Sequence, residues 1–158
     1  MQLNERVKIG TIVTKNRIAV PPMVCFHWSD DNGYVTERTI EHYHDMAAGG
    51  AGFIIGEATA VLKRGRLHNT ELGLWEDKQI EGWKRLADEV HQFDVPFVVQ
   101  LLHAGVAGID PDADCPSDYI PEFQKAQVVG HEMSKDRIHE VIDAYVQAAR
   151  RAQKAGLD

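Results

Sequence analysis

An α/β fold built around a parallel sheet is predicted by two features of the 158-residue sequence. Short, β-rich apolar runs alternate with segments whose apolar residues recur at helical spacing, an order typical of βα units with right-handed crossovers. The strand-like runs are also continuously apolar, as parallel strands buried on both faces are. Doubly wound sheets and (β/α)₈ barrels both fit this pattern. Pro21-Pro22-Met23 follows the first strand in place of a Gly-rich phosphate turn, which disfavours a dinucleotide-type Rossmann unit.

The first fifty residues predict a hairpin, a strand and a helix. Residues 7–13 carry two β-rich runs around a glycine, which is typical of a short hairpin. Residues 16–21 are expected to form a buried strand that ends at Pro21-Pro22, because proline cannot donate to a ladder. Thr36 is placed to cap a helix that Gly49-Gly50 ends.

The middle of the chain predicts two further strands around a second helix. Residues 53–55 form the next strand, and a long loop over residues 58–75 follows it. Asp77 is expected to cap the helix, and residues 96–102 form the third strand. The apolar face of the helix consists of Ile80, Trp83, Leu86, Ala87 and Val90.

The last fifty-odd residues predict an irregular excursion and a long helix. The excursion covers residues 103–132, and Ser134 caps the helix that Gly156 ends. A new strand would begin after Asp158, so we expect a partial domain over residues 1–158, truncated before the fourth strand. The expected buried stripe of the helix consists of Ile138, Val141, Ile142, Tyr145, Ala149, Ala152 and Ala155.

Composition and charge argue against several classes of function. The formal net charge of −7 disfavours a nucleic-acid partner, which would require a basic face. No apolar run is long enough to span a bilayer, and the N-terminus lacks the apolar core of a signal peptide, so we expect a cytoplasmic protein without a membrane partner. Cys25 and Cys115 are far apart and the eight histidines are scattered, so neither a disulfide framework nor a metal site is expected.

Candidate functional residues lie at the C-terminal ends of the predicted strands, where α/β enzymes place their sites. These ends carry residues 21–26, 57–59 and 100–105. They offer backbone groups and neutral polar side chains rather than a carboxylate pair, a Ser-His-Asp set or a Walker turn. Such a neutral site suits a planar heterocycle with amide edges, for example a flavin, better than it suits hydrolysis.

The chain resembles the Old Yellow Enzyme family, the FMN-dependent NAD(P)H:flavin oxidoreductases and ene-reductases, at an ordered set of short motifs. Each motif alone is weak, but together they run along the whole chain in the order of the family. The matching stretches are Lys15-Asn16-Arg17-Ile18-Ala19-Val20-Pro21-Pro22-Met23, Gly33-Tyr34-Val35-Thr36, His42-Tyr43, Gly49-Gly50-Ala51-Gly52-Phe53-Ile54-Ile55-Gly56-Glu57-Ala58, Leu72-Gly73-Leu74-Trp75, Gln100-Leu101-Leu102-His103-Ala104-Gly105 and Ala148-Ala149-Arg150-Arg151-Ala152-Gln153-Lys154-Ala155-Gly156.

The resemblance implies the N-terminal part of a (β/α)₈ TIM barrel, namely a bottom hairpin and about three βα units, with FMN at the C-terminal mouth. The backbone of residues 21–24 would line the isoalloxazine, Ala58 would approach the flavin through its main chain, and Gln100 would hydrogen-bond the pyrimidine edge. Phe26 would contact the substrate. The implied cofactor-binding residues are Pro21, Pro22, Met23, Val24, Ala58 and Gln100.

The implied reaction passes a hydride from NAD(P)H through FMN to an activated C=C of an enone or enoate. The catalytic acid, the substrate-binding pair and the phosphate loops of the family belong to later strands, so no catalytic residue is expected in this chain. We therefore expect it to be inactive alone, and to form an oligomer or to need a C-terminal half. The alternative is a self-associating or split half-barrel that acts as an interaction module without catalysis.

Several residues depart from the family or have a second interpretation. Val24 falls where the family often has Thr or Cys, and Val106 falls where it often has Arg. Glu57 could pair with Arg17 or another cation in the barrel floor. His103 is expected to be a packed loop histidine rather than a catalyst.

Overall fold

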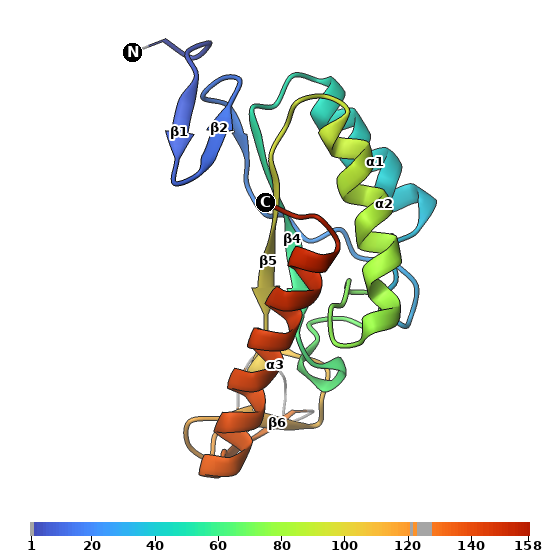
Figure 1. The fold of residues 1–158 in the computed structure, drawn as a ribbon. Coiled ribbons are helices and arrows are strands. Elements are labelled where there is room, and N and C mark those ends of the chain that lie inside the picture. Colours follow the sequence, from blue (N-terminus) through green and yellow to red (C-terminus); the bar gives the residue numbers. More distant parts are fainter. Residues whose placement is uncertain (1, 121, 123–127) are drawn as a thin grey trace.

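The computed structural model describes residues 2–120, 122 and 128–158. Its elements follow the predicted alternation of strands and helices (Figure 1). Three short 3₁₀ helices, η1 (Lys63–Gly65), η2 (Asp77–Gln79) and η3 (Gly105–Ala107), lie between them. The main elements are β1 (Val7–Ile9), β2 (Ile12–Thr14), β3 (Ala19–Val20), α1 (Glu37–Ala48), β4 (Phe53–Ala60), α2 (Ile80–His91), β5 (Phe97–Leu102), β6 (Asp112–Cys115), β7 (Val129–Glu132) and α3 (Lys135–Lys154).

The central sheet has the order β3-β4-β5, with both pairs parallel. The hairpin β1–β2 is antiparallel and stands at the opposite end of the sheet from β6 and β7 (Figure 1). Side chains from α1, α2 and α3 join one buried cluster with Ile54 of β4 and Phe97 of β5. All three helices therefore cover one face of the sheet, as in a segment of a barrel wall, and this separates the barrel from the doubly wound alternative.

The core lies between the sheet and the helices. Trp83 of α2 is completely buried, and its indole Nε1 donates a hydrogen bond to the Gly73 carbonyl oxygen at 3.0 Å. The ring of Tyr43 from α1 lies 5.3 Å from that of Phe97, centroid to centroid. The predicted apolar face of α2 is confirmed, since Trp83, Leu86, Ala87 and Val90 are buried and Ile80 packs against them.

Two of the strand predictions need correction. The strand expected over residues 16–21 is reduced to Ala19–Val20, and Ile18 is half exposed rather than buried, because no other strand covers this edge among the described residues. The second strand continues to Ala60 instead of yielding to a loop at residue 58. Its extension is stabilised by the ladder with β5, which runs to the pair Ala60–Leu102.

The helix ends follow the predicted capping with one exception. The Thr36 side chain accepts a hydrogen bond from the Thr39 backbone, and the Ser134 side chain accepts one from the Arg137 backbone. Gly156 has φ +86, which allows the chain to leave α3. Asp77 is not the cap of α2, because it opens η2 and pairs with Arg151 at 2.8 Å.

The excursion after β5 contains more regular structure than expected. β6 and β7 form a parallel pair in the register Asp112–Val129 to Cys115–Glu132. The buried stripe of α3 also differs from the prediction, because Ile138, Ile142 and Ala149 are exposed whereas Ala148 is buried. Only the C-terminal half of this helix packs on the sheet, and its N-terminal half extends beyond it toward β6 and β7 (Figure 1).

Across the part of the chain that the structure describes, no helix combines the length and the hydropathy needed to cross a bilayer. The same residues contain no group of three or more His, Cys, Asp or Glu side chains arranged to hold a metal ion.

Candidate functional site

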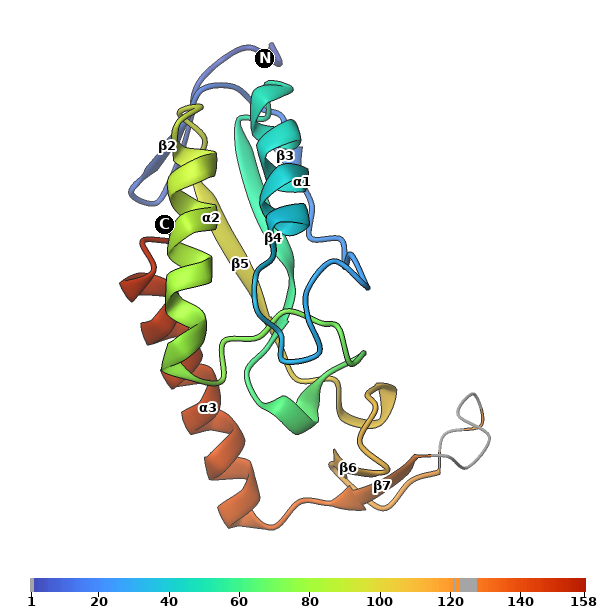
Figure 2. The same ribbon diagram turned by 90° about the vertical axis from the view of Figure 1, so that its right-hand side faces the viewer.

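The C-terminal ends of β4 and β5 lie at one end of the sheet, which is called the mouth below (Figure 2). β3 ends beside the start of β4, and the residues after it continue along β4 toward the mouth, where the Cys25 amide contacts Glu57. The ladder places Val20 beside Ile54, and Ala58 opposite Gln100. Two of the residues expected at the cofactor therefore come from adjacent strands at the same level of the sheet. Ala58 and Gln100 are far apart in sequence, and the parallel register alone brings them together.

A β-bulge lies directly before this pair. Gly56 pairs with Val99 and Ala58 with Gln100, so Glu57 has no partner of its own on β5. Bulges disrupt the ladder locally and re-aim side chains, and they are frequent beside active sites. Glu57 is completely buried here, although its neighbours in the ladder are small residues. A glycine inside a strand is the sequence signal that could have indicated this bulge.

Glu57 holds the segment that follows β3. Its Oε2 atom accepts a hydrogen bond from the Cys25 backbone amide at 2.9 Å, and its own amide donates to the Tyr43 hydroxyl at 2.8 Å. Burial raises the pKa of the Glu57 carboxyl, whereas the hydrogen bonds from Cys25 and Tyr43 lower it. The suggested pair with Arg17 is wrong, because Arg17 contacts Glu5 at 3.5 Å.

The segment of residues 21–26 presents its backbone at the mouth. The amides of Met23 and Val24 donate no hydrogen bond to any other described residue. Met23 is 51% exposed and Phe26 is 40% exposed. The Phe26 ring is supported by the ring of His68, at 4.9 Å between centroids. The segment thus offers free donors and apolar surface to a ligand.

Cys25 lies within the same segment but turns to α1. Its Sγ atom is 3.5 Å from His42 Nε2. Burial, followed by the charge of Glu57, raises the pKa of the thiol. The thiol is therefore not activated as a nucleophile.

Gln100 is exposed in the C-terminal half of β5, and its side-chain amide makes no hydrogen bond to another described side chain or backbone group. An amide both donates and accepts, so it can pair with the alternating donors and acceptors of a flavin pyrimidine edge. The free backbone amides of Met23 and Val24 can also donate hydrogen bonds to a flavin. These groups fit a flavin, whereas nothing among them could transfer a proton.

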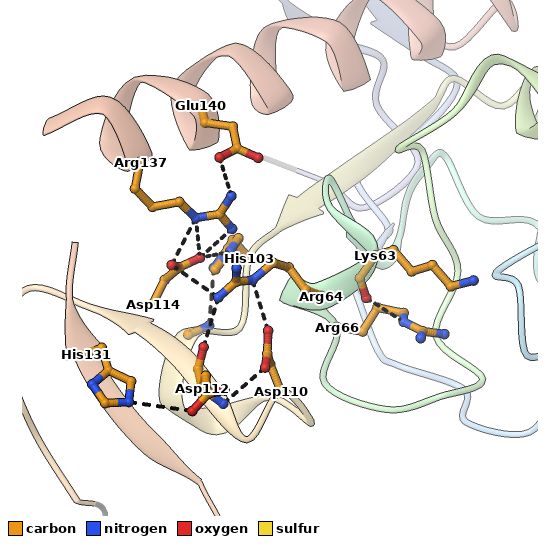
Figure 3. Close-up of polar contacts among 11 residues, drawn as sticks. Lys63, Arg64, Arg66, His103, Asp110, Asp112, Asp114, His131, Arg137 and Glu140 are labelled. Carbon is orange, nitrogen blue, oxygen red and sulfur yellow. Dashed lines mark hydrogen bonds and ion pairs between the residues drawn. The ribbon is translucent and has the colours of Figure 1, made fainter. Parts of the chain in front are cut away.

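The structure also reveals polar residues that the sequence analysis did not single out. Arg64, Asp114 and Arg137 form a charged cluster at the mouth around His103 (Figure 3). His103 is mostly buried, and burial lowers the pKa of its ring more than Asp114 raises it. Its packed position agrees with the expected structural role. Charged residues far apart in sequence gave no periodic signal, so only the fold could bring them together.

Comparisons with known proteins identify this arrangement. The sequence profile of the NADH:flavin oxidoreductase / NADH oxidase family matches residues 2–158. The chain is 36% identical to an NADPH dehydrogenase of Clostridium acetobutylicum, over 100% of this chain and 46% of that protein. An NADPH dehydrogenase of Listeria monocytogenes is also 36% identical, over 99% of this chain and 46% of its own length. The chain therefore spans about half the length of the curated relatives it matches.

Solved structures agree. The Old Yellow Enzyme from Pichia sp. AKU4542 superposes with a TM-score of 0.90 at 27% identity, over 99% of this chain and 44% of that one. The Old Yellow Enzyme homologue from Zymomonas mobilis gives a TM-score of 0.86 at 26% identity, over 100% and 47%. The expected fold is confirmed as part of such a TIM barrel, with an open sheet in the described residues.

The profile and the relatives also confirm the expected cofactors at the level of the family, which pairs FMN with a reduced nicotinamide nucleotide. The strand-end site, the one-sided helix layer and the match over residues 2–158 lead to one assignment: the chain belongs to the NADH:flavin oxidoreductase / NADH oxidase family, the family of the Old Yellow Enzymes.

Proposed function

We propose that this chain forms part of the FMN site of an Old Yellow Enzyme-type oxidoreductase that reduces an activated C=C of an enone or enoate with NAD(P)H. The observation that carries the proposal is the juxtaposition of Ala58 and Gln100 across β4 and β5, beside the free amides of Met23 and Val24. A bound FMN would supply hydride transfer from the nicotinamide to the substrate.

Each residue at the mouth has a distinct task in this proposal. The backbone of Pro21, Pro22, Met23 and Val24 forms the wall against which the ring system lies, and the amides of Met23 and Val24 supply donors. Ala58 leaves room for close main-chain approach because its side chain is a single methyl group. Gln100 fixes the orientation of the pyrimidine edge, and Phe26 offers apolar surface to the substrate.

Glu57 acts one step away from the ligand. Its carboxylate fixes the amide of Cys25, directly after the wall segment, and so sets the path of that segment. Val24 cannot hydrogen-bond a ligand through its side chain, so the electronic properties of a bound flavin would depend on backbone donors.

The described site lacks a proton donor for the second carbon of the substrate. Of the titratable groups at the mouth, Glu57 is buried against Cys25 and Tyr43, and His103 is packed against Asp114. Neither lies free to protonate a substrate. We therefore propose that the 158-residue chain alone does not catalyse the reaction, and that its binding of FMN relies on the isoalloxazine rather than on the phosphate.

Titration of the purified chain with FMN, followed by quenching of flavin fluorescence, tests this function. We expect weak saturable binding by the wild-type chain and a loss of about tenfold or more in Gln100→Ala, because two hydrogen bonds to the flavin edge are removed. Gln147→Ala on the exposed face of α3 is the matched control and should bind like the wild type. Equal affinities of the two variants would contradict the assignment of Gln100.

An activity assay addresses the second part of the proposal. The chain with FMN, NADPH or NADH and 2-cyclohexen-1-one should show no enone-dependent oxidation of the nicotinamide above the rate of free FMN. Turnover that depends on the chain would show that it holds a complete site.

A second candidate function, self-association of the half-barrel without catalysis, is favoured by one observation. Apolar side chains remain exposed on α3 and at the β3 edge, where Ile18 is 50% and Ile142 53% exposed. Exposed apolar surface favours association. Light scattering distinguishes the two candidates: a stable dimer with no measurable FMN binding supports the module, and a monomer with a cooperative melt rejects it.

A further inference from the structure

We propose that Asp114 is a positioning residue that fastens the β6–β7 pair to the mouth of the barrel segment through the side chains of Arg64, His103 and Arg137. The fastening itself stands on the contacts below, whereas its consequence for flavin rests on the function proposed above. Figure 3 shows the cluster, in which the Asp114 carboxylate lies at the centre.

The strongest contact joins β6 to the start of α3. Arg137 Nε lies 2.9 Å and 3.0 Å from the two carboxylate oxygens of Asp114, and Arg137 Nη2 lies 2.6 Å from Oδ2. A guanidinium that grips a carboxylate through two of its nitrogens fixes distance and orientation together. Glu140, one turn further along α3, holds Nη1 of the same guanidinium at 2.5 Å. The start of α3 is therefore tied to β6 in a defined geometry.

Two further contacts connect the same carboxylate to the strand ends. Arg64, in η1 after β4, has Nη2 3.6 Å from Asp114 Oδ1. His103, directly after β5, has Nε2 3.2 Å from Asp114 Oδ2, close enough for electrostatic attraction but without hydrogen-bond geometry. Arg64 also contacts Asp110 at 2.9 Å and the Asp112 carbonyl oxygen at 2.8 Å. Asp114 is thus the one carboxylate of the described residues that contacts η1, the end of β5 and α3 together.

Burial separates this cluster from ordinary surface ion pairs. The side chain of Asp114 is 8% exposed, and those of His103 and Arg137 are also largely buried. Exposed pairs contribute little, but removing one partner of a buried pair leaves an uncompensated charge. The hydrogen bond from Arg137, with smaller contributions from Arg64 and His103, holds the pKa of Asp114 below its usual range. The carboxylate is therefore ionised wherever the protein is folded near neutral pH.

The position of the cluster links it to the candidate site. His103 follows Gln100 by three residues, and the His103 ring packs against Gly65 of η1, whose carbonyl oxygen accepts a hydrogen bond from the Ala104 amide at 2.8 Å. Loosening Asp114 would therefore release β6 and β7 and also the loops that continue β4 and β5. The proposal predicts a local effect at the mouth without loss of the helix-covered core.

Hydrogen exchange measured by mass spectrometry on the 158-residue chain tests the fastening. In Asp114→Asn we expect exchange to accelerate about tenfold or more at the Val129 and Met133 amides, which bond to Pro111 and Cys115 at 2.8 and 2.9 Å, because the buried Arg137 guanidinium loses the counter-charge of Asp114. Peptides from α1 and α2 should be unchanged. Asp112→Asn is the matched control on the same strand, since the Asp112 side chain is 80% exposed and its carboxylate contacts His131 at 3.6 Å, whereas the Arg64 contact uses the Asp112 backbone, which the substitution keeps.

A second variant keeps the test decisive if Asp114→Asn unfolds as a whole. Arg64→Gln removes one half-exposed partner and should accelerate exchange in β6 alone, and Asp114→Glu should restore part of the protection. If Arg64→Gln and Asp114→Asn both behave like Asp112→Asn, the positioning role is wrong. FMN titration of the same variants separates the two proposals. FMN binding by the wild type that weakens in Asp114→Asn supports both. Faster local exchange in Asp114→Asn, with no FMN binding in any variant, supports the fastening and rejects the flavin site.

Discussion

The helix-covered face of the β3-β4-β5 sheet differs sharply from the edge and the mouth of the sheet. On the helix-covered face, Ile54 and Phe97 are completely buried against Trp83. Away from the helices, Ile18 and Met23 are half exposed, at the edge and at the mouth. The strands thus contribute a closed core on the helix-covered face, whereas the residues before and after β3 leave apolar groups open at the edge and at the mouth.

Different residues of the segment therefore serve stability and ligand binding. Core packing depends on α1, α2 and the C-terminal half of α3, which are all present. The candidate flavin contacts Met23, Val24 and Gln100 add little to that packing, because they lie at strand ends and remain accessible. Substitutions in the two regions should therefore differ in their effect on the free energy of unfolding. Three variants test this difference.

The largest effect on stability is expected for Trp83→Ala. Trp83 is completely buried and donates to the Gly73 carbonyl oxygen, so its truncation leaves both a cavity and an unpaired acceptor. Its cost in the free energy of unfolding should be about 3–5 kcal/mol. Chemical denaturation provides the measurement, with Ile18→Ala on the open side as control at less than about 1 kcal/mol. Comparable losses of unfolding free energy in the two variants would mean that the core and the sheet edge are equally packed.

An intermediate effect is expected for Glu57→Ala. The substitution leaves the Cys25 amide without its acceptor and should cost about 1–3 kcal/mol. Glu57→Gln keeps an oxygen acceptor at this place and should lose less, because burial already disfavours the charged carboxylate. Thermal melts of both variants compare them. A Gln variant as unstable as the Ala variant would show that the negative charge, and not the hydrogen bond, matters.

A smaller and pH-dependent effect is expected for Glu71→Gln. Glu71 is completely buried, its Oε2 accepts from the Leu67 amide at 2.5 Å, and its Oε1 has no hydrogen-bond partner among the described residues. Burial raises its pKa from 4.5 to about 7. At this group the folded state therefore binds more protons than the unfolded state, so the contribution of Glu71 to stability is fully present below about pH 4.5 and is lost as the pH rises through about 7.

The amide of the Gln variant cannot ionise, so this contribution to the pH dependence should vanish. Relative to the wild type, Glu71→Gln should gain on the order of 1 kcal/mol at pH 8 and little at pH 5. Urea denaturation at the two pH values measures the difference. An equal change at both would place the ionisation of Glu71 outside this range.

Much of the fold could be predicted from sequence because its signals are local. Helical spacing identified the face of α2, and Thr36 and Ser134 identified two helix starts through their capping side chains. Continuous apolar runs identified the parallel strands. The order of the motifs identified the family, which the profile over residues 2–158 confirmed.

The remaining features depend on contacts between distant residues. Gly56 is a sequence signal for a bulge, but nothing near Glu57 in sequence indicates that the bulge buries it against Cys25, because the ladder with β5 creates that geometry. The parallel pairing of β6 with β7 and the charges around Asp114 likewise join segments that share no periodic pattern. The predicted buried stripe of α3 was partly wrong. Helical periodicity assumes that the whole helix packs on the sheet, but half of α3 extends beyond it.

The central claim is that the open end of the sheet, and not the helix-covered side, receives flavin. Hydrogen exchange of the wild-type chain with and without FMN tests it most directly, because the Met23 and Val24 amides have no described acceptor in the protein. We predict that FMN slows exchange at these two amides and at the end of β5 around Gln100, with no change in α1 or α2. Protection confined to the helices, or none at the mouth at saturating FMN, would contradict it.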